Sequence, residues 1–144
     1  MNEESLYLES VELLKVLIST QSFSFHEENT ATLLENWLNK NSIPFKRHVN
    51  NIYCHNKYYN EEKPNILLNS HHDTVEPNDS YTNDPYEPIV DQGKLYGLGS
   101  NDAGASLVSL LSTFKFFYDC KNLNYNLIFL ASAEEEKSGK NGIK

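Results

Sequence analysis

Three short clusters of ionisable residues in this sequence have types and spacings that metal-assisted chemistry could use. They are His71-His72-Asp73, Asn101-Asp102 and Glu134-Glu135-Glu136. Imidazole and carboxylate groups together are typical ligands of a Zn²⁺, Mn²⁺ or Co²⁺ site, and they differ from the cysteines of a structural zinc site. A carboxylate shared by two cations leaves a water between them, and a further glutamate can act as the base in a hydrolysis.

The first cluster places two adjacent histidines at the end of an apolar run, "NILLNSHHD". Successive side chains of a strand point to opposite faces, so His71 and Asp73 share one face and His72 lies on the other. A metal-bound histidine commonly donates its second ring N–H to a carboxylate, which a His-x-Asp pair can supply. The alternative is a pair of polar residues that leave a strand into a loop. On either interpretation we expect His72 to have a packing or supporting role.

The other two clusters also allow two interpretations each. Asp102 precedes a periodic apolar segment, where aspartate is a preferred helix N-cap, but its carboxylate can equally bind one or two cations. The three glutamates follow the apolar run "LIFLASA" and form either a solvated turn or an acidic group held against the core. A nearby cation would relieve the repulsion that such a group creates.

These clusters need a scaffold, and the hydrophobic pattern predicts one. We expect helices at 4–19, from the capping-box sequence "SFHE" at 24–27 to about residue 40, and at 102–118. One or two strands are expected within 44–56, and buried strands at 65–70 and 125–133. Two buried strands that flank a long helix indicate an α/β fold with a right-handed crossover. The clusters would then lie at the carboxyl ends of the strands, where ligands bind in such sheets.

Composition limits the classes of function. The chain has 144 residues, of which 39% are hydrophobic and 22% charged, and its net charge is −8. This is a globular composition without a basic stripe, so we expect neither nucleic acid nor a membrane surface as a partner. The N-terminus "MNEESLYLES" does not resemble a signal peptide, and Cys54 and Cys120 form no C-x-x-C motif. We therefore expect free thiols and a cytoplasmic location.

Four segments in order, "SHHDTVEP", "YTNDPYEP", "GKLYGLGSNDAGA" and "ASAEEEKSGKNG", resemble the successive motifs of the M20 peptidase family of co-catalytic zinc amidohydrolases. The resemblance covers roughly residues 5 to 143, and four ordered motifs are far more specific than any one. It implies an α/β, three-layer zinc-exopeptidase-like catalytic domain, a mixed sheet flanked by helices, here incomplete. Within the family, "YGLGSNDAGASL" and the glutamate segment look most like acetylornithine deacetylases.

The resemblance also implies roles for individual residues. The implied metal ligands are His71, Asp102 and Glu136, with Asp102 as the bridge between two metals. Asp73 would orient the histidine, and Glu135 would be the general base. An alternative register, with Glu134 as the base and Glu135 as the ligand, stays open. The implied cofactor is Zn²⁺, two ions per complete site, with Co²⁺ or Mn²⁺ as alternatives.

The expected function is metal-dependent hydrolysis of the amide bond of a small N-acylated amino acid, foremost N-acetylornithine in arginine biosynthesis. An M20-type dipeptidase, a carboxypeptidase or a succinyl-diaminopimelate desuccinylase is the alternative. Residues 1–144 would be the N-terminal part of the catalytic domain. The family's remaining acidic ligand, its last histidine and its dimerisation domain would lie outside this chain, and the whole enzyme would be a homodimer. An alternative of another class is a truncated fragment without catalytic activity.

Overall fold

The computed structural model describes residues 2–143. The helical elements are α1 (Glu3–Ile18), α2 (Glu28–Lys40), the irregular turn η1 (Ser100–Ala105) and α3 (Ser106–Phe117). The strands are β1 (Lys46–His48), β2 (Asn51–His55), β3 (Asn65–His71), β4 (Ile89–Asp91), β5 (Lys94–Tyr96) and β6 (Asn126–Ser132). None of the helices in this described part of the chain is long and apolar enough to cross a membrane.

The main sheet has four strands in the order β1-β2-β6-β3. Strands β3 and β6 are parallel, whereas β1, β2 and β6 pair antiparallel, so the sheet is mixed. Helix α3 lies between the two parallel strands in the sequence, as a crossover connection requires. Strands β4 and β5 form a separate hairpin within the long polar stretch that follows β3. These features confirm the predicted α/β class.

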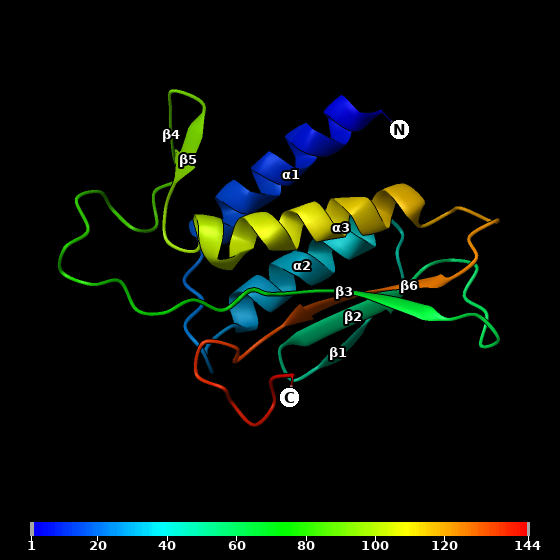
Figure 1. The fold of residues 1–144 in the computed structure, drawn as a ribbon. Helices are drawn as coiled ribbons and strands as arrows, with labels where there is room; N and C mark the ends of the chain where they lie inside the picture. The colour runs from blue at the N-terminus through cyan, green and yellow to red at the C-terminus, as the bar shows by residue number, and fades with distance from the viewer. Residues whose placement is uncertain (1, 144) are drawn as a thin grey trace.

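One face of the sheet carries the hydrophobic core. Figure 1 shows the three helices on the same side of the sheet, with α3 running alongside α1. The largest fully buried apolar side chains are Leu34 and Leu38 from α2, Ile52 from β2, Leu107, Leu111 and Phe114 from α3, and Phe129 from β6. Burial of these side chains is the main stabilising contribution, at about 1.5–3 kcal/mol for each large apolar group. The core thereby fixes the ends of β3 and β6 relative to α3.

The opposite face of the sheet is open. Tyr53 and Leu67 point to this side and remain exposed, since within residues 2–143 no second layer of helices covers them. The described chain thus supplies the sheet and the helices on one face of the expected architecture. Strand β3 was expected to be buried, and this expectation is wrong. It is an edge strand that pairs only with β6, and its Ile66 and Leu67 are exposed.

Two local predictions also need correction. Helix α3 begins at Ser106, so Asp102 lies in η1 and is not the N-cap of that helix. The capping box at 24–27 does not form either, because α2 begins at Glu28. Ser24 instead donates its hydroxyl to the Asp73 carboxylate, and Glu27 accepts the N–H of Phe25. The Ser24 side chain has thus found a more distant partner than the helix end beside it.

Candidate metal centre

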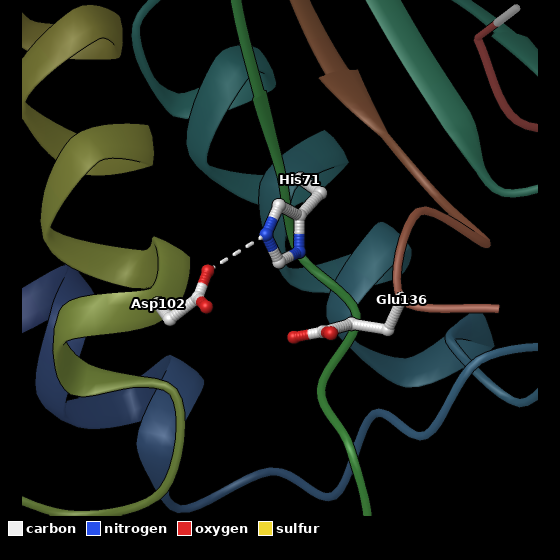
Figure 2. Close-up of side chains that lie close together, drawn as sticks. All are labelled: His71, Asp102 and Glu136. Carbon is white, nitrogen blue, oxygen red and sulfur yellow. Dashed lines mark hydrogen bonds and ion pairs between the residues drawn. The ribbon is translucent and has the colours of Figure 1, made fainter. Parts of the chain in front are cut away.

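Three segments meet at the carboxyl end of the parallel strand pair. His71 is the last residue of β3, Asp102 lies in η1, and Glu136 lies in the turn that follows β6. Figure 2 shows the three side chains converging from these segments, and one ligand atom from each lies within 4.8 Å of the others. This is the location that the sequence predicted, and the donor set of one imidazole and two carboxylates suits a divalent transition metal.

The ring of His71 has a defined orientation. Its Nδ1–H donates to the backbone carbonyl of Asp73 at 2.9 Å and lies 3.4 Å from that residue's Oδ1. With Nδ1 committed in this way, Nε2 faces Asp102, with 3.1 Å between Nε2 and Oδ1. The hydrogen bond to the Asp73 side chain raises the pKa of His71 to about 9 against the opposing effect of burial. A cation that binds at Nε2 would have to displace any proton there, because a metal-bound histidine is neutral.

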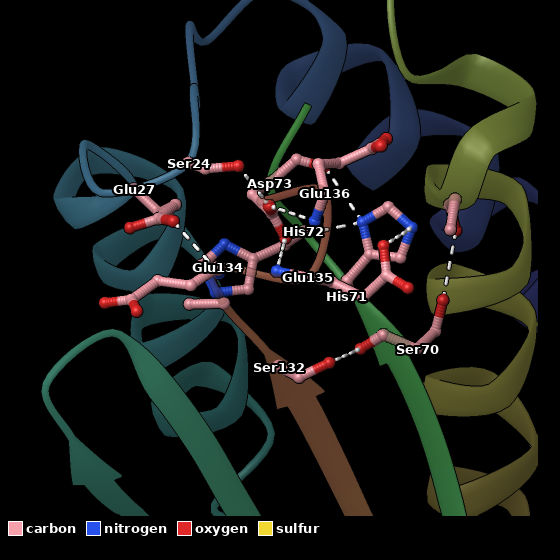
Figure 3. Close-up of polar contacts among 12 residues, drawn as sticks. Ser24, Glu27, Ser70, His71, His72, Asp73, Ser132, Glu134, Glu135 and Glu136 are labelled. Carbon is pink, nitrogen blue, oxygen red and sulfur yellow. Dashed lines mark hydrogen bonds and ion pairs between the residues drawn. The ribbon is translucent and has the colours of Figure 1, made fainter. Parts of the chain in front are cut away.

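Asp73 is buried and serves two neighbours at once. Its carboxylate accepts the hydroxyl of Ser24 at 2.7 Å and the backbone N–H groups of Glu135 and Glu136, each at 3.1 Å (Figure 3). Burial alone would raise the pKa of Asp73, but the hydrogen bonds from His71, Ser24 and the two N–H groups lower it to about 2. A charged carboxylate thus supports both the histidine and the turn that carries the glutamates.

The two glutamates after Glu134 face the cluster. Glu135 places Oε2 at 3.7 Å from Nε2 of His71 and is well exposed to solvent. Glu136 is half-buried, and its pKa is raised by burial and by the nearby negative charge of Asp102. The carboxylates therefore repel one another where they converge, and a divalent cation would remove that repulsion. The residues present fit a bound metal.

Glu134 points elsewhere. Its carboxylate accepts the backbone N–H of Asn141 at 3.0 Å and that residue's side-chain Nδ2–H at 2.6 Å. Its backbone is in the left-handed region, with φ of 59°, which turns the chain sharply after β6. This geometry favours the register in which Glu135 and Glu136 serve the site, over the one that uses Glu134 and Glu135.

The second histidine is structural. His72 donates Nε2–H to the backbone carbonyl of Asn50 at 2.9 Å, and its Nδ1 lies 2.9 Å from the hydroxyl of Thr30. Burial lowers the pKa of His72, which favours its neutral form. Strand alternation predicted that the two histidines would diverge, and the structure places them on different sides of β3 (Figure 3).

Two supporting residues were not predicted for the site. Ser24 and Glu27 lie in the loop between α1 and α2, and both are buried. Ser24 contacts Asp73, whereas Glu27 accepts the backbone N–H of Glu134 at 3.1 Å. The only sequence signal was the S-x-x-E pattern, which is equally typical of a helix cap and does not identify a partner more than a hundred residues away.

A cleft of about 320 Å³ opens beside the cluster. Asp102 and Glu136 form one end of it, and Thr74, Tyr81 and Asn101 line other parts. A larger hollow of about 430 Å³ lies over the 78–100 segment and shares Tyr81 with the cleft. None of the three cluster residues lines the larger hollow, whereas Asp102 and Glu136 line the smaller cleft, so the smaller cleft is the one positioned to hold a reacting group.

Comparison with known proteins identifies relatives of this arrangement. The sequence model described as "Peptidase family M20/M25/M40" matches residues 67–144, more than half of the chain. The chain is 25% identical over 139 residues to a succinyl-diaminopimelate desuccinylase of Nitratiruptor, covering 95% of this chain and 37% of that protein. It is 31% identical over 142 residues to an acetylornithine deacetylase of Shigella sonnei, covering 89% of this chain and 36% of that protein.

A solved structure supports the fold. A dinuclear metal-binding peptidase of the M20 family from Bacillus subtilis superposes with a TM-score of 0.68 at 18% identity. The alignment covers 94% of this chain and 37% of that one. The chain therefore spans little more than a third of the length of the proteins that it matches.

Proposed function

The chain belongs to peptidase family M20/M25/M40, and on that premise we propose that the enzyme containing it hydrolyses the amide bond of an N-acylated amino acid, with N-acetylornithine as substrate. The observation that carries the proposal is the convergence of His71, Asp102 and Glu136, of which Asp102 and Glu136 also line a cleft. The similarity to an acetylornithine deacetylase over most of the chain supports the choice of substrate.

His71, Asp102 and Glu136 would hold the metal, which we propose to be Zn²⁺, with Co²⁺ or Mn²⁺ as alternatives. When bound, a divalent cation supplies Lewis acidity to a carbonyl oxygen and lowers the pKa of a water. Asp102 places Oδ1 3.1 Å from Nε2 of His71, and Asp102 also lines the cleft. This position suits the bridging role proposed for it.

Glu135 is proposed as the general base. Its carboxylate is solvent-accessible, is held by no hydrogen bond from another side chain within residues 2–143, and lies beside the cluster. It can therefore accept a proton from the attacking water and later donate that proton to the departing amine nitrogen. Asp73 holds His71 through Nδ1 and holds the Glu135 backbone through its N–H, which keeps the base beside the cluster.

A second candidate keeps the chemistry and changes the substrate. The similarity to a succinyl-diaminopimelate desuccinylase extends over 95% of the chain, so a succinylated amine is the competing substrate. The arrangement of the three metal-site residues does not by itself discriminate between an acetylated and a succinylated substrate. Steady-state rates with N-acetylornithine, N-succinyl-diaminopimelate and a dipeptide, compared side by side, decide between the candidates.

We also propose a pathway, a location and an oligomeric state for the complete enzyme. It would act in arginine biosynthesis in the cytoplasm, as a homodimer, with residues 1–144 as the N-terminal part of its catalytic domain. By itself this part would bind a second metal weakly and have little activity. A metal titration that finds two tight sites in the 144-residue chain would contradict this division.

The base assignment has a direct test in the complete enzyme. Glu135→Gln removes the proton acceptor but keeps the shape of the side chain, so we expect turnover to fall by about 10²- to 10⁴-fold with metal content unchanged. Glu62→Gln makes the same change in charge at an exposed position and should leave turnover intact. Full activity of Glu135→Gln would show that another group is the base.

A further inference from the structure

The carboxylate of Glu27 is completely buried, yet it lies outside the metal cluster. Its Oε1 accepts the backbone N–H of Phe25 at 2.7 Å and that of Glu134 at 3.1 Å. Its Oε2 accepts the side-chain Nδ2–H of Asn50 at 2.9 Å. Among residues 2–143 it forms no ion pair with a lysine or arginine. Three N–H donors therefore satisfy the buried carboxylate of Glu27, with no cationic side chain as a partner. Both carboxylate oxygens are needed to accept these three hydrogen bonds.

Glu27 and Asp73 together bind three successive N–H groups. Glu134 donates to Glu27, and Glu135 and Glu136 donate to the two oxygens of Asp73, each at 3.1 Å (Figure 3). The turn after β6 is thus held from two sides, by the loop between α1 and α2 and by the end of β3. We call residues Glu134–Glu136 the glutamate turn. Two carboxylates from distant segments therefore hold its N–H groups, while its carbonyls accept local bonds from the N–H groups of Ser138 and Gly139.

The side chains that face the metal cluster do little to hold this turn. Glu135 is exposed, and Glu136 is only half-buried. Glu134 is anchored on the other side by Asn141. Because the metal-facing carboxylates have few contacts of their own, their placement follows from the backbone that carries them.

We propose that Glu27 is a positioning residue for the metal centre: by binding the N–H of Glu134, it fixes the glutamate turn so that Glu136 reaches the cation and Glu135 reaches the water. This inference rests on the proposed metallohydrolase function, and it assigns Glu27 no contact with substrate or metal.

The hydrogen-bond inventory explains why glutamine cannot replace the glutamate here. Glutamine has one oxygen and an NH₂ group. At the Oε1 position the NH₂ would face the N–H groups of Phe25 and Glu134, and at the Oε2 position it would face the NH₂ of Asn50. Reversing the Asn50 amide would break the bond that its Oδ1 accepts from Arg47. Glu27→Gln therefore leaves a buried donor without an acceptor and loosens the turn, although the volume of the side chain is unchanged.

The test is a Co²⁺ titration of the chain, followed by the visible absorption spectrum, with Glu27→Gln compared to the wild type. Glu28→Gln is the matched control, because it makes the same change one residue later at an exposed position. We expect the Co²⁺ dissociation constant to rise roughly tenfold in Glu27→Gln, with an altered spectrum as Glu136 withdraws, and to stay unchanged in Glu28→Gln. A folded Glu27→Gln variant that binds Co²⁺ with wild-type affinity and spectrum would overturn the inference.

A second measurement separates this inference from the proposed function. Amide hydrogen exchange of the wild-type chain should show the Glu134 N–H protected, and Glu27→Gln should expose all three amides of the glutamate turn. If the wild type binds no Co²⁺, the proposed function fails. The amide exchange rates of the wild type and of Glu27→Gln then show whether Glu27 holds the turn. If Glu27→Gln does not fold, the wild-type chain alone provides the test. Slow exchange of the Glu134 amide supports the inference, and exchange as fast as in an exposed turn overturns it.

Discussion

The helix–sheet core and the carboxyl edge of β3 and β6 are both buried, but they are built from opposite chemistry. The core packs Phe114 and Phe129 with ring centroids 6.0 Å apart, together with the aliphatic side chains of α1 and α2. The edge buries ionisable groups such as Glu27, Asp73 and His72, each hydrogen-bonded to several partners. The core removes apolar side chains from water, whereas at the edge protein hydrogen bonds take the place of hydrogen bonds to water.

The difference separates stability from function. Apolar packing is non-directional and tolerates changes that conserve volume, so the core determines how stable the fold is. Hydrogen bonds in a buried network are directional, and a missing partner displaces its neighbours, so the edge determines where Glu135 and Glu136 lie. Substitutions in the core should therefore have the largest effect on the free energy of unfolding, and substitutions of exposed side chains at the cluster should mainly change metal binding.

The largest expected effect is in the core. Phe114→Ala removes a fully buried ring and should lower the free energy of unfolding by about 3–5 kcal/mol. Phe116→Ala, in the same helix but with its ring 47% exposed, should cost less than about 1 kcal/mol. Urea denaturation followed by circular dichroism measures both. Equal losses for the two variants would contradict the division between core and surface.

The next largest effect is a dependence of the free energy of unfolding on pH, caused by Asp73 and His71 at the edge. It is expected when a chelator keeps the chain free of metal. The pKa of Asp73 is lowered from 3.8 to about 2, so its stabilising contribution is present above pH 3.8 and is lost as pH falls through 2. The pKa of His71 is raised from 6.5 to about 9, so its contribution is present below pH 6.5 and is lost as pH rises through 9. At about 1.4 kcal/mol per pKa unit, we expect each limb to change the free energy of unfolding by about 2–3 kcal/mol.

Two substitutions check this pH dependence. His71→Gln should remove the loss of stability on the alkaline side, because the titrating ring is gone. His48→Gln, at an exposed position, should leave the pH dependence unchanged. An alkaline limb that persists in His71→Gln would mean that another group produces it.

A smaller effect on stability is expected at the cluster itself. The Asp102 side chain is 76% exposed, so Asp102→Asn should change the free energy of unfolding by no more than about 0.5 kcal/mol. The same substitution should weaken Co²⁺ binding at least tenfold, because it removes a charged oxygen ligand. A variant that loses stability and keeps its metal affinity would reverse the expected pattern.

The smallest effect is a difference in reactivity between the two free thiols. Cys54 lies in the core beside Phe129, and burial raises the pKa of its thiol to about 12. Cys120 is only half-buried, just beyond α3. A thiol reagent at neutral pH should modify one cysteine in the native chain and both in urea. Rapid modification of both in the native chain would show that the core opens readily.

The sequence predicted the features that depend on local periodicity. Helices α1 and α2, the parallel strands and the divergence of His71 from His72 follow from the spacing of apolar residues and from strand alternation. The resemblance to the M20 family added the pairing of Asp102 with Glu136, which no local rule supplies. The structure brings these residues together with His71, and their roles as ligands stay predictions.

The missed features depend on distant partners. Ser24 has the pattern of a helix cap but donates to Asp73, 49 residues away. Glu27 binds an N–H group that is 107 residues away, which no window of the sequence reveals. The exposure of β3 has a similar origin, because a strand's apolar content does not tell whether a neighbour covers it. Long-range pairing of polar groups and the coverage of a sheet face are properties of the assembled fold.

We propose that His71, Asp102 and Glu136 together bind a divalent cation. The most direct measurement is a Co²⁺ titration of the wild-type chain, of His71→Ala and of the control His48→Ala, which removes an exposed histidine. We predict saturable binding with a visible absorption band in the wild type and in His48→Ala, and at least a tenfold loss of affinity in His71→Ala. Binding of equal affinity in all three chains would contradict the assignment of the metal centre.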